Sequence, residues 1–342
     1  MAGIGYSVTI GSLRASNKAR QGQAFIRSIT SELTMDGAGG RCTVELVPSD
    51  AGLPTPGDKT TIDLDGGNGA VTVFTGLVLE ARGSTDTSLV LGGDALAKLA
   101  RLDVSGAYEQ MSAGSIVREL VNKAGGTPGT IDDGPTFPSY VLHRGPRALR
   151  HILRLAEQSG FDVFTDGQGK VHFTAPKQGG ADHTFVYDSQ VLRTQVAKPL
   201  PAIDGFEVWG EGAASSQGEK KAHWLVDDLA SIHGKAALGT TGKVQAGSTG
   251  KSSREVKDGS VRAGADASTQ AKARVGALAA RPLHGFIEVL GAPAVKPGDL
   301  VKVDDIPEGH PVEALLSGKV LRVRSVRHTL NALTGFTTRM EL

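Results

Sequence analysis

The chain has 342 residues, of which 46 are glycine and only 5% are aromatic. Its 37 lysines and arginines nearly balance 36 acidic residues, and no run of like charges stands out, so we expect no specific nucleic-acid binding. The sequence has neither an apolar run long enough to span a membrane nor the start of a signal peptide, which favours synthesis in the cytoplasm without membrane insertion.

The length exceeds that at which single hydrophobic cores stop growing, so two or three domains are expected. The glycine content favours a β-rich protein with many tight turns. Cys42 is the only cysteine and lies in an alternating stretch with Val44 and Leu46, which predicts a strand residue in a protein that folds without disulfides.

A pattern in the first third of the chain recurs in the last third. Each copy has an apolar strand with one glutamate, a Pro-Gly-Asp turn, an alternating strand, and a later glycine that begins a strand ending in arginine. Proline fixes φ and glycine supplies a positive φ, so each Pro-Gly pair predicts a tight turn. The marker residues are Gly57, Asp58 and Gly76 in the first copy, and Gly298, Asp299 and Gly318 in the second.

This repeat predicts two related antiparallel β-barrels or sandwiches, one in residues 1–103 and one in residues 199–342. Two generic β-hairpins with the same turn chemistry are the alternative. Between the two copies, apolar residues recur at helical spacing from Ser112 to Gly125 and again from Pro146 to Gly160. A hairpin around residues 166–169 follows, so residues 104–198 are predicted to form a separate α+β module.

Residues 210–262 are rich in Gly, Ser and Lys and have weak periodicity, which predicts an exposed or partly disordered insertion in the second β unit. A helix is expected from about Asp266 to Arg281. Gly250-Lys251-Ser252 looks like the end of a phosphate-binding loop. However, Gln245 stands where the first glycine of such a loop belongs, which favours a flexible loop instead.

No catalytic or metal-binding motif stands out. The nine histidines form no metal signature, and no serine lies in a nucleophile elbow. The carboxylate pairs Asp227-Asp228 and Asp304-Asp305 are adjacent, so in a strand they point to opposite faces. We therefore predict no catalytic residue, no metal and no cofactor.

The last residues alternate in the manner of a half-buried strand. Residues 331–335 predict a hairpin turn before this strand, which runs to the end of the chain. The residues expected to share its buried face are Phe336, Thr338, Met340 and Leu342.

Three stretches of the chain, residues 107–125, 148–173 and 320–342, carry a family resemblance. The first stretch leads into a helix. The second forms a Leu-rich helix followed by a hairpin, and the third forms a closing hairpin with an Arg-His pair before its turn. Their order resembles the baseplate hub family of contractile-tailed phages, often called late control gene D proteins. It is similar also to the N-terminal hub part of type VI secretion spike proteins.

The resemblance implies a fold and an assembly. Two related β-barrel tube domains would flank the α+β module, and three chains would form a homotrimeric, quasi-sixfold ring. This ring would connect the sixfold tail tube protein to a trimeric spike and line the central channel, through which DNA or cargo can pass. The final strand would close the second barrel, because an unpaired edge there would leave a hole in the wall.

The resemblance also implies partners and a location. They are the tail tube protein, a spike expected on a separate polypeptide, and other baseplate proteins. The particle would be assembled in the bacterial cytoplasm, as part of a virion tail baseplate or an injection system, and a phage, a bacteriocin and an injection system all stay open. Two other functions also stay open, a tail-associated cell-wall hydrolase and a monomeric glycan- or peptide-binding β-barrel module.

Overall fold

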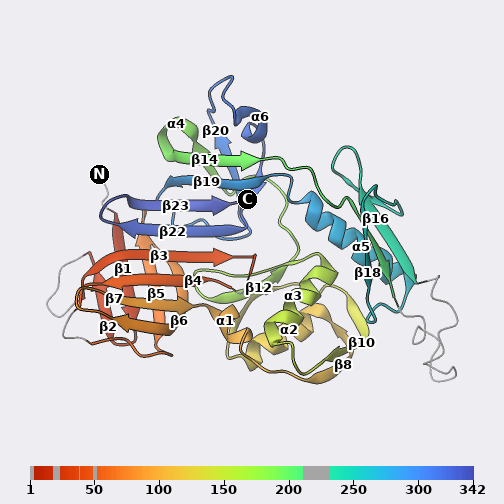
Figure 1. Cartoon of the computed structure of the whole chain (residues 1–342), viewed down its shortest axis with the longest axis horizontal. Coiled ribbons are helices and arrows are strands. Elements are labelled where there is room, and N and C mark those ends of the chain that lie inside the picture. The colour runs from red at the N-terminus through yellow and green to blue at the C-terminus, as the bar shows by residue number, and fades with distance from the viewer. Residues whose placement is uncertain (1–3, 18–23, 38, 49–51, 211–231) are drawn as a thin grey trace.

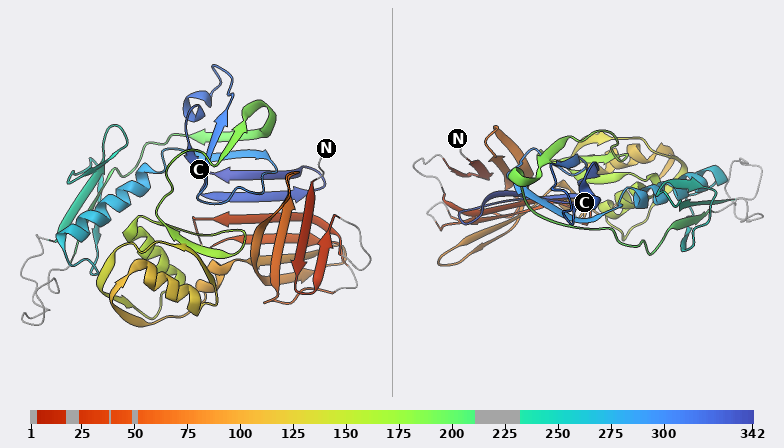
Figure 2. Two further views of the ribbon diagram at one scale, coloured as in Figure 1. Left: turned by 180° about the vertical axis from the view of Figure 1, so that it is seen from behind. Right: turned by 90° about the horizontal axis from the view of Figure 1, so that it is seen from above.

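The structure is a computed structural model that describes residues 4–17, 24–37, 39–48, 52–210 and 232–342. Its main feature is a large curved sheet, with an α+β module on one side and a smaller sheet covered by a helix at the far end (Figure 1). Seen from behind and from above, these parts lie side by side in a flat layer (Figure 2).

The large sheet has eleven strands in the described part of the chain, in the order β14-β19-β23-β22-β3-β4-β7-β6-β5-β1-β2. Its N-terminal strands are β1 (Gly5–Ile10), β2 (Leu13–Ser16), β3 (Ile26–Thr34), β4 (Arg41–Leu46), β5 (Lys59–Asp65), β6 (Ala70–Gly83) and β7 (Ser88–Gly93). Its other strands are β14 (Val191–Ala197), β19 (His284–Leu290), β22 (Ser325–Asn331) and β23 (Gly335–Glu341).

The two ends of the chain repeat one strand arrangement. In the N-terminal unit the order is β3-β4-β7-β6, and in the C-terminal unit it is β14-β19-β23-β22. The first half of β6 pairs with β5 and its second half with β7. In the C-terminal unit these two pairings are divided between two strands, since β21 (Leu321–Arg322) pairs with β20 (Leu300–Asp304) and β22 pairs with β23.

The expectation of two separate barrels needs correction. The described residues form no closed barrel, because β22 of the C-terminal unit pairs with β3 of the N-terminal unit and joins both into one sheet. Nor is the C-terminal unit purely antiparallel, since β13 (His183–Val186) pairs with β20 in parallel. The strands β13 and β14 precede residue 199 but pair with C-terminal strands.

Each unit has its own hydrophobic core. The N-terminal core includes Val44, Ile62 and Phe74, and the C-terminal core includes Ile287 and Val301. Alternation explains both, because every second side chain of a strand points to the same face. Two short helices complete the C-terminal unit, α4 (Tyr187–Gln190) and α6 (Glu313–Leu316).

The α+β module contains the two helices and the hairpin predicted from the sequence. Ser112 caps the first helix by accepting a hydrogen bond from the N–H of Ser115, and Gly160 ends the second in a left-handed conformation with φ of 68°. The elements are α1 (Ala95–Leu99), β8 (Gly106–Ser112), α2 (Ala113–Lys123), β9 (Thr127–Ile131), β10 (Thr136–Leu142), α3 (Ala148–Ser159), β11 (Asp162–Thr165) and β12 (Lys170–Thr174).

The sequence predicted an exposed or partly disordered insertion at residues 210–262. Residues 232–262 instead contain three β-strands. With one preceding strand they form a four-stranded sheet on which the predicted helix packs through small side chains such as Ala236 and Ala271. This core combines three alanines with four Val and Ile residues from short, separated segments, which leaves little hydrophobic periodicity and is why the sequence suggested a loop. The elements are β15 (Gly205–Trp209), β16 (His233–Leu238), β17 (Val244–Ala246), β18 (Ser253–Lys257) and α5 (Gly264–Ala279). Residues 211–231 of the insertion lie outside the described residues.

This small unit docks onto the module through α3. The carboxylate of Asp258 accepts hydrogen bonds from Arg154 at 3.2 Å and from Gln158 at 2.5 Å. Arg274 of α5 forms an ion pair with Glu157 of α3. Among the described residues, no helix is both long and apolar enough to cross a membrane.

Candidate assembly interface

The two Pro-Gly-Asp turns have the same hydrogen bonds. The N–H of Gly57 donates to the Val78 carbonyl at 2.9 Å, and the N–H of Gly298 donates to the Val323 carbonyl at 2.9 Å. In return the N–H groups of Val78 and Val323 donate to the carbonyls of Asp58 and Asp299 at 2.8 and 2.9 Å. The turns are structurally equivalent, and Val78 corresponds to Val323.

Further features of these turns agree. The φ angles of Gly57 and Gly298 are 100° and 90°, a conformation that favours glycine. The side chains of Asp58 and Asp299 each accept a hydrogen bond from the N–H three residues earlier, at 2.9 and 3.1 Å. These four marker residues therefore occupy matching places in the two units.

The later marker glycines do not match each other. Gly76 lies within β6, where an added Cβ would collide with the Gly93 carbonyl. Gly318 has φ of 67° in the loop before β21, and an added Cβ would meet no atom within 4 Å. Because Gly76 lies two residues before Val78 whereas Gly318 lies five before Val323, the sequence repeat and the structural repeat differ here in register.

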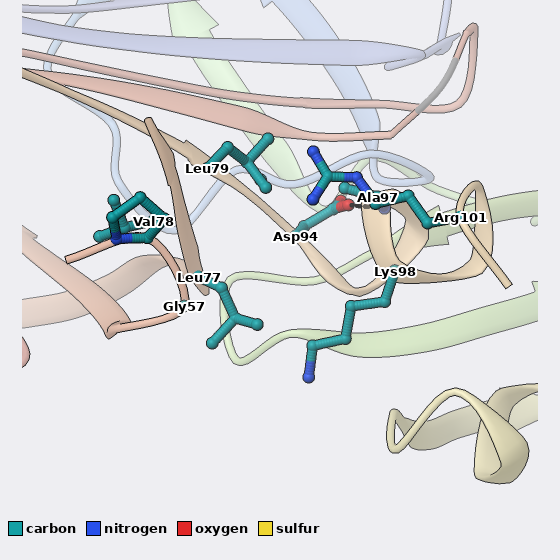
Figure 3. A pocket seen from close by; sticks show the side chains of 10 residues that line it. Gly57, Leu77, Val78, Leu79, Asp94, Ala97, Lys98 and Arg101 are labelled. Carbon is teal, nitrogen blue, oxygen red and sulfur yellow. Dashed lines mark hydrogen bonds between the residues drawn. The ribbon is translucent and has the colours of Figure 1, made fainter. Parts of the chain in front are cut away.

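The surroundings of the two turns differ. A Cβ added at Gly298 would lie 3.2 Å from the Phe164 ring and 3.4 Å from Met35, whereas one at Gly57 would meet no atom within 4 Å. Gly57 instead borders an open depression of about 280 Å³. Figure 3 shows Leu77 and Leu79 of β6 on one side of this depression and residues of α1 on the other.

The C-terminal strand lies inside the large sheet, between β19 and β22, and does not close a barrel. Phe336 is 3% exposed and belongs to the N-terminal core, not to the core of its own unit. An added Cβ at Gly291 would overlap its ring, so a residue without a side chain is required there. Met340 lies in the C-terminal core, and β23 thus contributes to both cores.

Thr338 is buried as predicted, whereas Leu342 follows the end of β23 and is only partly buried; both are held by hydrogen bonds. The Oγ1 of Thr338 accepts from the N–H of Ala292 at 2.9 Å and lies 3.0 Å from Nδ1 of His328. Burial lowers the pKa of His328 to about 4, so this ring is neutral at pH 7. The N–H of Leu342 donates to the Gly285 carbonyl at 3.0 Å, which ties down the last residue.

The junction between the two units is made by β22 and β3. Arg327 lies directly opposite Glu32, and their side chains form an ion pair at 2.8 Å. Beyond the end of β3, the N–H of Met35 donates to the Arg324 carbonyl at 2.9 Å, and Arg324 pairs with Asp36 at 2.7 Å. Burial alone would raise the pKa of Asp36, but its arginine partners outweigh burial and lower it.

Buried polar contacts join the module to both units. Asp162 of β11 pairs with Arg322 of the C-terminal unit at 2.6 Å. Asp94, at the N-terminus of α1, accepts a hydrogen bond from the N–H of Gly40 at 2.6 Å and another from the hydroxyl of Thr165. Burial raises the pKa of Asp94, which is only 1% exposed. These polar contacts thus fix the module against both units, although the buried Nε of Arg322 has no hydrogen-bond partner in the described part of the chain.

Neither a metal site nor a phosphate site is found among the described residues. No group of three or more His, Cys, Asp or Glu side chains could hold a metal ion there. The N–H groups of Lys251 and Ser252 already donate to the carboxylate of Asp204, at 3.0 and 2.8 Å, which leaves them unavailable to a phosphate. Asp227 and Asp228 lie outside the described residues.

No protein-family model and no curated protein matches the sequence. Solved structures do. The 43 kDa tail protein of prophage MuSo2 from Shewanella oneidensis superposes with a TM-score of 0.71 at 14% identity, over 98% of this chain and 97% of that chain. A tail protein from Neisseria meningitidis MC58 gives a TM-score of 0.70 at 14% identity, over 99% and 96%.

A third structure is the E. coli c3393 protein, described as a component of the type VI secretion system similar to the T4 bacteriophage tail proteins gp27 and gp5. It gives a TM-score of 0.56 at 13% identity, over 98% of this chain and 75% of that chain. At these identities the similarity establishes a shared fold. The chain therefore has the fold of phage tail proteins along almost its whole length.

Proposed function

We propose that the chain is a structural hub of a contractile tail baseplate or a contractile injection system. The observation that carries this proposal is the duplication, in which two units of the same strand order are joined edge to edge through β22 and β3. A homotrimer of such a chain presents six similar units on a threefold axis. It can therefore meet a sixfold tail tube on one face and a trimeric spike on the other.

The fold supports this proposal, because the structures that share it come from tail proteins and a type VI secretion component. The partners we propose are two further copies of the chain, the tail tube protein, a separate trimeric spike and other baseplate proteins. The ring lines the channel through which DNA or cargo passes, and it acts without catalytic turnover. Its place is the tail baseplate of a virion, or the equivalent part of an injection particle.

The experiment that tests this function is the mass in solution of the purified chain, alone and mixed with its candidate spike, by light scattering or native mass spectrometry. We expect a trimer that binds one trimeric spike. A chain that stays monomeric in both samples contradicts the hub. A dye-release assay on cell walls with the same samples checks the absence of turnover, and release of dye by the chain would favour the hydrolase.

A further inference from the structure

The two units are joined by β3 and β22. Each of these strands has a counterpart in the other unit, and in the described part of the chain the corresponding edge of that counterpart has no strand beside it. The strand order makes β14 the counterpart of β3, and the second half of β6 the counterpart of β22. Among the described residues, β14 has no strand on its outer side, and residues 79–83 have a partner strand only on the β7 side. Figure 1 shows β14, β19, β23, β22, β3 and β4 stacked in sequence, with β14 at the outside.

We propose that residues 196–200, at the end of β14 and just after it, pair antiparallel with residues 79–83 of a second copy, in the register that β3 and β22 use within the chain. This inference rests on the proposed trimer and identifies the edges that close it. Each chain has one edge of each kind, so head-to-tail pairing of three chains continues the sheet around a closed ring.

The register on the β6 side follows from the equivalent turns. Val78 and Val323 occupy the same place, so Leu79 corresponds to Arg324 and Arg82 to Arg327. The partner strands agree with this alignment. Glu80 lies opposite Leu91 in β7, and its counterpart Ser325 lies opposite Glu341 in β23.

The register on the β14 side follows from the inner strands. Val90 of β7 and Met340 of β23 are counterparts, and they lie opposite Val44 and Ile287. Val44 lies opposite Ile29 of β3, and Ile287 lies opposite Thr194 of β14. Ile29 and Thr194 are therefore counterparts as well. Counting along the chain then matches Ala197 with Glu32, Pro199 with Thr34, Leu200 with Met35 and Pro201 with Asp36.

Leu200 is the apolar side chain that this register needs. It is 95% exposed, whereas its counterpart Met35 is 7% exposed and lies against the Gly298 turn. In a second copy, the counterpart of that turn is the one at Gly57, which is uncovered and borders the depression lined by Leu77 and Leu79. Leu200 of one chain therefore fills the depression at Gly57 of the next, whose lining residues are drawn in Figure 3.

The pair next to Leu200 is matched in kind. Within the chain, Asp36 and Arg324 form an ion pair, and their counterparts Pro201 and Leu79 are both apolar. An ion pair is thus replaced by an apolar contact on both sides at once, and no charge is left unpaired.

Pro199 fits the same register although it lacks an N–H. Its counterpart Thr34 lies between Leu33, whose carbonyl accepts from the Ser325 hydroxyl, and Met35, whose N–H donates to Arg324. Adjacent residues of a strand direct their backbone groups to opposite sides, so Thr34 faces away from β22. A proline at this position therefore loses no hydrogen bond to the neighbouring chain.

A pair of cysteines tests the register directly. Arg82 and Ala197 are counterparts of Arg327 and Glu32, which lie directly opposite each other. We expect the double variant Arg82→Cys, Ala197→Cys to form disulfide-linked trimers under mild oxidation, on a non-reducing gel. The native Cys42 is buried, and burial raises its pKa to about 12, so it stays inert. In the control Arg82→Cys, Val196→Cys, a shift of one residue places the two thiols on opposite faces, and we expect little cross-linking.

The outcomes separate the inference from the function on which it rests. A trimer by light scattering in which the control cross-links as well as the matched pair, or in which neither cross-links, overturns the register and leaves the hub standing. A monomer under every condition overturns both.

A charge on the proposed contact provides a second test. Leu200→Asp leaves the fold of one chain intact, because this side chain is 95% exposed, and we expect the trimer to be lost at concentrations at which the unaltered chain is fully trimeric. The matched control is Leu333→Asp, at a hairpin tip where Leu333 is 98% exposed, and it should remain trimeric. A trimer of undiminished mass in Leu200→Asp overturns the proposed contact.

Discussion

Phe336 holds the two units together by placing a side chain of one unit in the core of the other. We expect Phe336→Ala to lower the free energy of unfolding by about 3–5 kcal/mol, because it leaves a cavity among well-packed side chains. Urea denaturation measures this difference. Leu333→Ala, in the same hairpin but 98% exposed, should change it by less than about 0.5 kcal/mol. Equal effects of the two substitutions would show that Phe336 is not buried.

His328 makes stability depend on pH. Its pKa in the folded chain is lowered from 6.5 to about 4, so between these values the unfolded chain binds a proton that the folded chain does not. Its contribution is fully present above pH 6.5 and is lost as the pH falls toward 4, by up to about 3 kcal/mol. We expect the difference in unfolding free energy between the unaltered chain and His328→Gln to vary over this range. A difference independent of pH would contradict the buried neutral ring.

For single residues, the sequence predicted correctly those properties that depend on the local pattern of the chain. Alternation along the final strand placed Phe336 and Met340 on a buried face, and both are buried. It could not show that they enter different cores, because the path of the sheet decides which core a face meets. Likewise nothing local distinguishes the exposed Leu200 from its buried counterpart Met35, since their difference arises only from the strands that cover them.

At the scale of elements, the two equivalent turns provide a matched comparison. Alanine at either glycine is strained by the positive φ, at a cost of about 1–3 kcal/mol. At Gly298 the new methyl group would also lie too close to the Phe164 ring, at 3.2 Å, whereas at Gly57 it meets open space. We therefore expect Gly298→Ala to lower the melting temperature of the chain more than Gly57→Ala, by differential scanning calorimetry. The reverse order would contradict the difference in their surroundings.

Removal of β23 tests which parts depend on it. A chain that ends at Thr334 leaves β19 and β22 without their shared partner and removes side chains from two cores. We expect it to lose ring assembly, while α2 and α3 keep slow amide exchange because their core lies within the module. Hydrogen exchange followed by mass spectrometry measures both regions. Normal assembly of this shortened chain would contradict the role given to the strand.

The helices of the module were predictable because capping and helical periodicity are local signals. Ser112 and Gly160 mark their ends in the sequence and in the structure. The four-stranded sheet of residues 205–257 was not predictable. Its core is assembled from a few Val, Ile and Ala residues on separate short segments and from contacts such as that between Gly234 and α5, which carry no continuous hydrophobic pattern.

For the whole molecule, the duplication was visible in the sequence through its turn chemistry. The sharing of one sheet was not, because the pairing of β22 with β3 joins residues from opposite ends of the chain. Pairing between distant strands has no local signature, and only the three-dimensional structure shows which edges remain open. This is why the proposed contact between chains follows from the structure and not from the repeat alone.

The central claim is that three chains form a ring through the edges of β14 and β6. A cryo-electron microscopy reconstruction of the purified assembly, calculated without imposed symmetry, tests it most directly. We expect a threefold ring of six similar units, with Leu200 of each chain against the Gly57 turn of the next. A ring in which these edges face solvent, or an assembly without a threefold axis, would contradict the account.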